Sequence, residues 1–291
     1  EMSQVKVGSV TYKIETLYVY FLYRWIASFF RKLFPFGPLD QILWRTKYIA
    51  TINGGDGFSD IYGTRLFKSR LNETRLAMAY NIPLILLPQT LGPFRQPSNY
   101  NLARKILRYS TYLYVRDLKF KSEMEKFQLQ YELCRDLSFY MAPEEVADVE
   151  ILPFSIGLNV SGLAYSNQFN ALAGKFANYP YLISSIITYF QGKSIPVYLV
   201  SHSYNFSKPE RNNDDLEACK QVYASLKDKR GVFVVDRDLT PPQVKYLIAK
   251  FDFFIGTRMH ACFAALFTNT PVFGLSYSYK FKGAFEGFGL S

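Results

Sequence analysis

The stretch from Phe251 to Gly283 reads FDFFIGTRMHACFAALFTNTPVFGLSYSYKFKG. Its apolar run ends abruptly at Gly256, which is typical of a buried parallel strand that leads into a turn. A helix is predicted next, with Thr257 as its N-cap and with apolar residues at helical spacing. A second strand is predicted from Pro271 to Leu275. Strand, helix and strand in this order predict part of a parallel α/β sheet.

This stretch also carries the chemistry that we consider most informative. Arg258 and His260 fall in the first turn of the predicted helix, where free N–H groups and the helix dipole favour an anion. An arginine beside them makes that preference specific for carboxylate or phosphate. The second strand delivers Ser276, Ser278 and Lys280 to what we expect to be the same edge of the sheet. We therefore predict that this edge is the active site.

The rest of the chain repeats the alternation of strand and helix. Strands are expected at residues 48–53, 82–87, 112–115, 154–159, 196–201 and 232–235, and helices at 66–81, 99–110, 177–191, 214–229 and 241–250. The composition shifts in the acidic, proline-containing run that precedes Pro153. We place a domain boundary there. The pattern predicts two doubly wound α/β domains, residues 1–149 and 150–291, facing each other across a cleft.

Candidate site residues also occur in the N-terminal half. Asp56 lies in a glycine turn after the first of these strands, where its carboxylate would face a crevice. Gln89 lies in a Pro/Gly loop after the next strand, and Arg116 ends the strand after that. Other interpretations stay open, because glycine turns with an Asp are common structural features. Arg116 could equally form an ion pair with Asp117.

Four motifs in this chain resemble those of the polysaccharide pyruvyl transferase family. They are INGGDGFSDIYG at 52–63, LPQTLGPF at 87–94, SIGLNVSGL at 155–163, and GTRMHA with the following PVFGLSYSYKFKG at 256–283. No motif of the family is recognised before Ile52. The resemblance implies an enzyme that moves the enolpyruvyl group of phosphoenolpyruvate onto two hydroxyls of a sugar as a ketal. It also implies two Rossmann-like domains arranged as in GT-B glycosyltransferases, with the acceptor on residues 1–149 and the donor on 150–291.

The donor that the resemblance implies sets the requirements of the site. Phosphoenolpyruvate has a phosphate and a carboxylate, for which Arg258, Lys280 and Arg116 are the candidate cations. Its methylene carbon must be protonated while a sugar hydroxyl is deprotonated, and His260 and Asp56 are the candidates for these two roles. Which of the two gives the proton is left open, as is a role for His260 in phosphate binding alone. The further predicted substrate-binding residues are Ser278, Asn159 and Gln89.

Neither a metal nor a cofactor is required by this mechanism, and the sequence favours neither. The chain has two histidines and three widely spaced cysteines, a pattern that predicts neither a zinc site nor a disulfide framework. Such a small number of cysteines is compatible with a reducing cytoplasm. Asp236-Arg237-Asp238 matches the DxD pattern of metal-dependent glycosyltransferases, but we interpret it as a loop at a strand end. His202 follows a strand, and both a structural and a functional role stay open for it.

Two other functions are compatible with the composition. The first is a GT-B-like glycosyltransferase whose Arg and Lys residues hold the diphosphate of a nucleotide sugar. The second is a nucleic-acid binder, suggested by the net charge of +10. The cations are dispersed and no binding motif occurs, so we expect no nucleic-acid partner. No GxGxxG or GxxxxGK[ST] loop is present either.

The most apolar segment runs from Leu17 to Phe36. Three cations, Arg24, Arg31 and Lys32, interrupt it before the roughly 20 uncharged residues that a membrane span requires. It could form an amphipathic helix on the protein's own sheet, or a helix that lies in a membrane interface. The resemblance implies an acceptor that is often lipid-linked. We therefore expect a cytoplasmic protein with possible peripheral contact at the inner face of the membrane.

Overall fold

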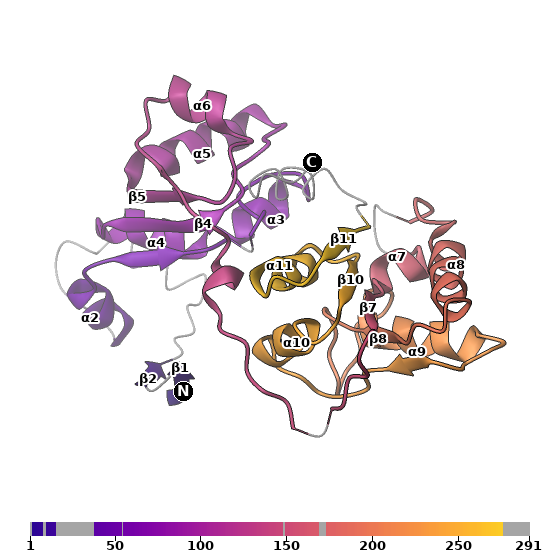
Figure 1. The fold of residues 1–291 in the computed structure, drawn as a ribbon. Helices are drawn as coiled ribbons and strands as arrows, with labels where there is room; N and C mark the ends of the chain where they lie inside the picture. Colours follow the sequence, from indigo (N-terminus) through magenta and orange to yellow (C-terminus); the bar gives the residue numbers. More distant parts are fainter. Residues whose placement is uncertain are drawn as a thin grey trace. The chain divides into compact units, whose positions relative to one another are not determined.

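The computed structural model describes residues 2–7, 10–15, 38–53, 55–147, 149–168 and 173–275. The chain is a mixed α/β protein with parallel sheets (Figure 1). It divides into two compact units, residues 1–135 and 136–291. The assignment of residues 1–149 and 150–291 as domains with separate roles stays a prediction.

Unit 2, residues 136–291, is built on a parallel sheet with the order β11-β10-β7-β8-β9. Its strands are β7 (Ile156–Asn159), β8 (Val197–Val200), β9 (Val232–Val234), β10 (Phe253–Gly256) and β11 (Val272–Gly274). Every residue of β7 and β8 is buried, as expected for strands that are covered on both faces. The order reverses between β7 and β10, and in such sheets ligands bind beside the carboxyl ends of the two strands at this point.

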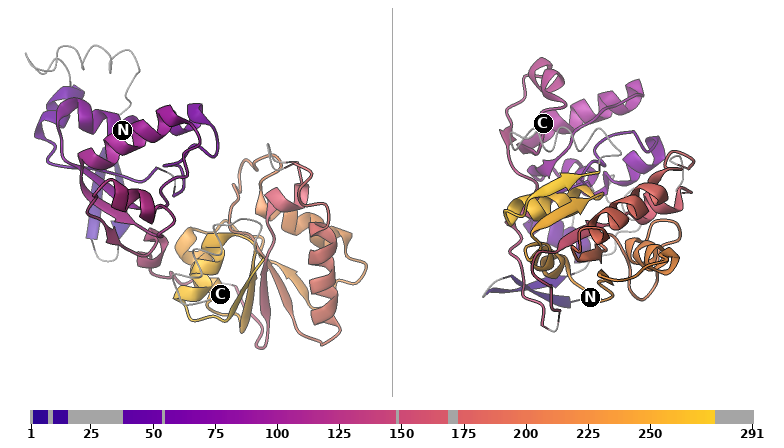
Figure 2. Two further views of the ribbon diagram at one scale, coloured as in Figure 1. Left: turned by 90° about the horizontal axis from the view of Figure 1, so that it is seen from above. Right: turned by 45° about the vertical axis from the view of Figure 1, so that its right-hand side comes forward.

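Helices cover both faces of this sheet (Figures 1 and 2). They are α7 (Gly162–Ser166), α8 (Tyr179–Gln191), α9 (Asp215–Ser225), α10 (Pro241–Ile248) and α11 (Met259–Phe267), with a short 3-10 helix, η1 (Leu137–Tyr140). Leu199 packs in the core with α8 and α9, whereas its neighbours Tyr198 and Val200 pack with α10 and α11. This two-residue alternation makes unit 2 a doubly wound sheet.

Unit 1, residues 1–135, has a parallel sheet whose strands follow chain order. They are β3 (Ile49–Thr51), β4 (Leu84–Gln89), β5 (Ser110–Val115) and β6 (Glu132–Leu133), and the helices are α2 (Pro38–Arg45), α3 (Thr64–Ser69), α4 (Asn72–Tyr80), α5 (Pro97–Tyr109) and α6 (Lys121–Lys126). Within the described residues, β4 and helices α3 to α6 share a single apolar core. A separate antiparallel pair is formed by β1 (Met2–Val7) and β2 (Val10–Glu15).

Two predicted elements differ from the structure for identifiable reasons. The helix predicted at 66–81 is two helices, because the carbonyl oxygen of Arg70 accepts a hydrogen bond from Asn53 Nδ2 instead of continuing the helix. The N-cap of α11 is Arg258 and not Thr257. The Thr257 hydroxyl donates instead to the carbonyl oxygen of Asn159, 3.0 Å away in the interior.

No helix in the described part of the chain is long and apolar enough to cross a membrane. The stretch from Leu17 to Phe36 lies outside the described residues, so its predicted contacts stay a prediction.

Candidate active site

Asn159 joins three strand ends at the point where the sheet order of unit 2 reverses. Its Oδ1 accepts the backbone N–H groups of Thr257 (3.2 Å) and Arg258 (2.8 Å), which follow β10. Its Nδ2 donates to the carbonyl oxygen of Val200, 2.9 Å away at the end of β8. The side chain is fully buried. These bonds favour a role for Asn159 in holding the loops of the site in place, and its predicted contact with substrate stays a prediction.

The guanidinium of Arg258 is paired with the carboxylate of Asp215. Its Nη2 lies 2.7 Å from Oδ1, and its Nε lies 3.0 and 3.2 Å from the two carboxylate oxygens. The same Nη2 also donates to the carbonyl oxygen and the side-chain Oδ1 of Asn213. The Arg258 side chain is 14% exposed and that of Asp215 is fully buried. An anion at this arginine would therefore meet a guanidinium whose orientation is already fixed.

Asp215 is also bound by backbone N–H groups from two loops. Gly162, after β7, donates to its Oδ1 at 2.9 Å, and His202 and Ser203, after β8, donate to its Oδ2 at 3.2 and 3.0 Å. A Cβ on Gly162 would overlap the backbone of Asp214, so only glycine lets this turn approach α9 so closely. One buried carboxylate thus fixes the loops after β7, β8 and β10.

His260, in the first turn of α11, is placed by three side chains. Its Nε2 lies 3.7 Å from Oδ2 of Asp136. Its ring is stacked on that of His202, with centroids 6.5 Å apart and an angle of 12° between the planes, and meets Phe263 edge-on at 5.7 Å. The His260 side chain is 45% exposed, whereas that of Asp136 is 8% exposed. An accessible imidazole beside a buried carboxylate is suited to exchanging a proton with a ligand.

Asp136 is positioned at the start of η1, which a buried lysine holds in place. Its Oδ1 caps η1 by accepting the N–H of Ser138 at 2.9 Å. At the other end of η1, Nζ of Lys245 donates to the carbonyl oxygens of Ser138 and Met141 at 2.8 and 2.7 Å. The same Nζ lies 3.3 Å from the ring centroid of Phe267 in α11. Burial lowers the pKa of Lys245 to about 8. This cluster fixes Asp136 against α11 and so against His260.

His202 is neutral at physiological pH. Burial is the largest cause, and together with the electrostatic effects of His260 and Arg258 it outweighs the opposing carboxylate of Asp215, lowering the pKa of His202 to about 4. Because its imidazole stays neutral at pH 7, His202 can donate one hydrogen bond and accept another.

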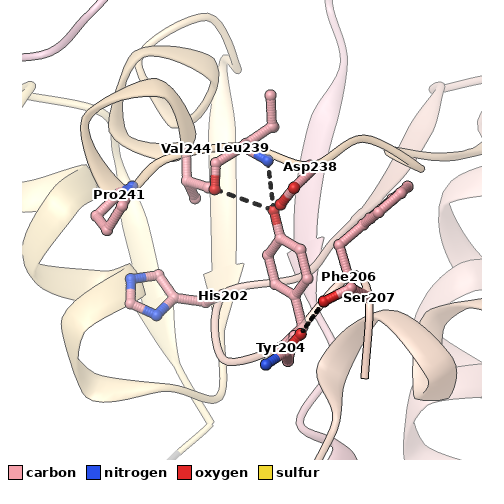
Figure 3. A pocket seen from close by; sticks show the side chains of 9 residues that line it. His202, Tyr204, Phe206, Ser207, Asp238, Leu239, Pro241 and Val244 are labelled. Atoms are coloured by element: carbon pink, nitrogen blue, oxygen red, sulfur yellow. Dashed lines mark hydrogen bonds between the residues drawn. The ribbon is translucent and has the colours of Figure 1, made fainter. Parts of the chain in front are cut away.

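His202 also lines a pocket of about 290 Å³ between the loops that follow β8 and β9 (Figure 3). Asp238 of the DxD sequence lines this pocket, whereas Asp236 pairs with Lys220 at 3.0 Å. Within the described residues, no three His, Cys, Asp or Glu side chains are grouped as metal ligands.

In unit 1, Arg116 takes part in a network at the ends of β4 and β5. Its Nε donates to the hydroxyl of Thr90 at 2.9 Å, and that hydroxyl donates to Oδ2 of Asp117. Gly55 adopts a left-handed conformation with φ +73°, and a Cβ there would lie 3.1 Å from Nη1 of Arg116. Glycine is therefore the residue that this turn requires, and it lets the guanidinium lie directly against the chain.

Gln89 and Asp56 have different surroundings in the same unit. Gln89 is fully buried, and its Oε1 accepts the N–H of Asn53 at 3.0 Å. Among the described residues, neither its Nε2 nor Oδ1 of Asn53 has a hydrogen-bond partner. Asp56 is half-buried, and its Oδ2 accepts the hydroxyl of Tyr62 at 2.8 Å. The roles predicted for Gln89, Asp56 and Arg116 stay predictions, as do those of Ser278 and Lys280, which lie outside the described residues.

A family model described as polysaccharide pyruvyl transferase matches residues 6–279. The chain belongs to this family. The resemblance seen in the four motifs is thereby confirmed, and the match also includes the segment before Ile52 in which no motif was recognised. Membership identifies the chain as a pyruvyl transferase and implies a polysaccharide acceptor.

Two carboxylates of this candidate site were not singled out from the sequence. The sequence does contain a signal for Asp215, because two acidic residues, Asp214 and Asp215, stand at the start of a helix. The first caps the helix backbone, so the second is available for another partner. The sequence contains no such signal for Asp136, because its partner His260 lies far along the chain and η1 is a single short turn. The position of His202 in the site was left open by the sequence and depends on its contact with His260.

The first prediction concerns stability at Arg258. If Arg258 only bound an anion, its truncation would leave unfolding nearly unchanged. The structure predicts instead that Arg258→Ala lowers the free energy of unfolding by about 3–5 kcal/mol, because it leaves the buried carboxylate of Asp215 without its cation. Urea denaturation followed by circular dichroism measures this loss.

The matched control is Arg230→Ala. Arg230 is paired with Asp228 at 2.7 Å on an exposed surface, and we expect no measurable change. An unchanged denaturation midpoint in Arg258→Ala would show that the ion pair does not support the fold.

The second prediction concerns acid stability. Since the pKa of His202 is about 4 in the folded state and about 6.5 in the unfolded state, the unfolded state binds more protons between these values. Stability is therefore lost as the pH falls through this window. From pH 7 to pH 5 this residue should account for about 2 kcal/mol of lost stability. His202→Gln should lose correspondingly less, as measured by urea denaturation at both pH values; equal losses in both proteins would contradict the assignment.

Proposed function

We propose that this pyruvyl transferase uses phosphoenolpyruvate to form a pyruvate ketal on two hydroxyls of one sugar in a surface or capsular polysaccharide precursor. The observation that supports this most strongly is the grouping of His260, Asp136 and the oriented guanidinium of Arg258 where the sheet order of unit 2 reverses. This group combines a cation for the donor's negative charges with an accessible imidazole for proton transfer.

In the proposed reaction, a sugar hydroxyl attacks the central carbon of phosphoenolpyruvate while the methylene carbon takes up a proton and becomes a methyl group. A second hydroxyl of the same sugar then displaces phosphate, and the proton that it loses goes to a base or to the leaving phosphate. His260 and Asp56 are the proposed acid–base pair, with Asp136 orienting His260. Arg258, Lys280 and Arg116 neutralise the carboxylate and the leaving phosphate. Ser278, Asn159 and Gln89 complete the proposed set of substrate-binding and positioning residues.

A GT-B-like apposition of two α/β domains is part of this proposal. The donor groups are assigned to residues 150–291 and the acceptor groups to residues 1–149. Unit 2 supports the donor assignment, because its sheet reverses order beside Arg258 and His260, as ligand sites of open α/β sheets do.

The third prediction tests the chemistry. We expect His260→Gln to lower kcat by about 10²–10⁴, the range for losing a positioned proton-transfer group. Asp136→Asn should lower kcat less, because Asp136 acts through His260. The assay supplies phosphoenolpyruvate with nitrophenyl and lipid-linked glycosides, and follows phosphate release and the mass of the product.

The control for this assay is Asp228→Asn, which removes an exposed carboxylate outside the site and should keep full activity. A folded His260→Gln protein with unchanged kcat would remove His260 from the mechanism. Transfer from UDP- or GDP-sugars without use of phosphoenolpyruvate would replace the proposal with the glycosyltransferase alternative.

The fourth prediction concerns the acceptor's location. We propose that the acceptor is a lipid-linked oligosaccharide and that residues 17–36 contact the inner face of the membrane peripherally. Each Lys or Arg near an anionic surface contributes about 1 kcal/mol, so a few cations beside an apolar helix face suffice for reversible binding. The wild type should co-sediment with liposomes that contain anionic lipid, and a Trp25→Ala, Phe29→Ala variant should do so less. Co-sedimentation that depends neither on the lipid charge nor on the two substitutions would exclude this contact.

A further inference from the structure

The pocket beside His202 has a chemistry unlike that of the proposed donor site. No Lys or Arg is among its described lining residues, and its charged side chain is the carboxylate of Asp238. Lys220 lies 6.0 Å from the ring centroid of Phe206, but its ammonium is paired with Asp236 at 3.0 Å. A phosphate or a carboxylate in this pocket would meet a like charge without a cation to hold it. The pocket therefore suits a ligand without negative charge.

Its walls combine aromatic and apolar surface with a few polar groups. Phe206 is 46% exposed, and Leu239, Pro241 and Val244 supply further apolar surface. The polar lining residues are His202, Asp238, Asn205 and Ser207, and the hydroxyl of Ser207 donates to Oδ1 of Asn205 at 3.1 Å. A sugar ring has the complementary chemistry, because its C–H face packs on an aromatic ring while its hydroxyls donate to a carboxylate or an imidazole nitrogen. The volume of about 290 Å³ is at the small end of ligand pockets, which suits one sugar residue rather than a nucleotide.

The two loops that form the pocket are tied to each other. The hydroxyl of Tyr204 accepts the N–H of Leu239 at 2.8 Å and lies 3.1 Å from the carbonyl oxygens of both Arg237 and Leu239 (Figure 3). On the other side, Asp214 Oδ2 accepts the N–H of Asn205 at 2.9 Å. The walls are thus fixed before any ligand arrives, which reduces the entropy that binding must remove.

The pocket is also next to the group proposed for proton transfer. His202 lines the pocket, and its ring is stacked on that of His260. We propose that this pocket is a subsite for a neutral sugar residue of the acceptor, the one that neighbours the sugar receiving the pyruvate ketal, so that part of the acceptor binds to residues 150–291 in addition to the acceptor groups assigned to residues 1–149. The link to the acceptor rests on the proposed function, whereas the binding of a neutral sugar does not. The enzyme would then discriminate between acceptors by the residue next to the reacting one.

Binding without any donor tests the subsite directly. Saturation-transfer difference NMR is recorded with methyl glycosides and disaccharides of glucose, galactose, mannose and N-acetylglucosamine. At least one of these sugars should bind the wild type, and both Phe206→Ala and Asp238→Asn should raise the Kd for that sugar by about tenfold. Tyr181→Ala removes an aromatic ring that is 78% exposed on α8 and does not line the pocket, so it should bind as the wild type does. Binding of inorganic phosphate should be the same in all four proteins.

Kinetics then separate this subsite from the proposed reaction. With a disaccharide acceptor, the two pocket variants should raise the acceptor KM by about tenfold and leave the KM for phosphoenolpyruvate unchanged. With a monosaccharide acceptor, they should match the wild type. Sugar binding that both variants weaken, in a protein that transfers nothing from phosphoenolpyruvate, would support the subsite and overturn the proposed reaction. Absence of sugar binding, or equal binding by the wild type and both variants, would overturn the subsite.

Discussion

The buried carboxylate of Asp215 is the constraint on which the site of unit 2 depends. An ionised carboxylate in the protein interior is costly unless charges and N–H groups surround it. Here backbone N–H groups from the loops after β7 and β8 and the guanidinium that follows β10 all converge on it. Displacing any of these loops would leave part of the charge without a partner. The loops therefore share one stable arrangement, and that arrangement orients Arg258 and His202.

A second buried charge, that of Lys245, acts on η1 and on the end of α11. Lys245 holds η1 through two carbonyl oxygens and lies on the ring of Phe267, while Phe139 of η1 packs 5.3 Å from Phe263. Asp136 at the start of η1 is thereby fixed beside His260. The exposed imidazole of His260 thus has a buried carboxylate and a neutral imidazole as neighbours. This rigidity suits proton transfer, where small displacements are costly.

The strand ends of unit 2 carry two regions of different chemistry. Arg258, in its ion pair with Asp215, and the N-terminal turn of α11 form the region proposed to bind the anionic donor. The pocket lined by Tyr204, Phe206 and Asp238 has no Lys or Arg among its described lining residues, and His202 contacts both regions. If the enzyme binds phosphoenolpyruvate and a neutral sugar together, as proposed, adjacent regions of different chemistry would keep the two substrates from competing for the same surface.

The sequence by itself determined the alternation of strands and helices in most of the chain, the identity of the family and the edge of unit 2 at which Arg258 and His260 lie, but it did not predict the shorter elements β6, α6 and α7. These features follow from local signals: apolar runs, strand-end glycines, Pro241 in the first turn of α10, and motifs read in order. Only the tertiary structure decided which residues that are distant in the sequence bond to each other. Lys245 and Ser138 lie 107 positions apart, and Thr257 and Asn159 lie 98 apart, yet their bonds fix η1 and the start of α11. Burial and long-range pairing depend on which segments the fold brings together, and no local pattern encodes that proximity.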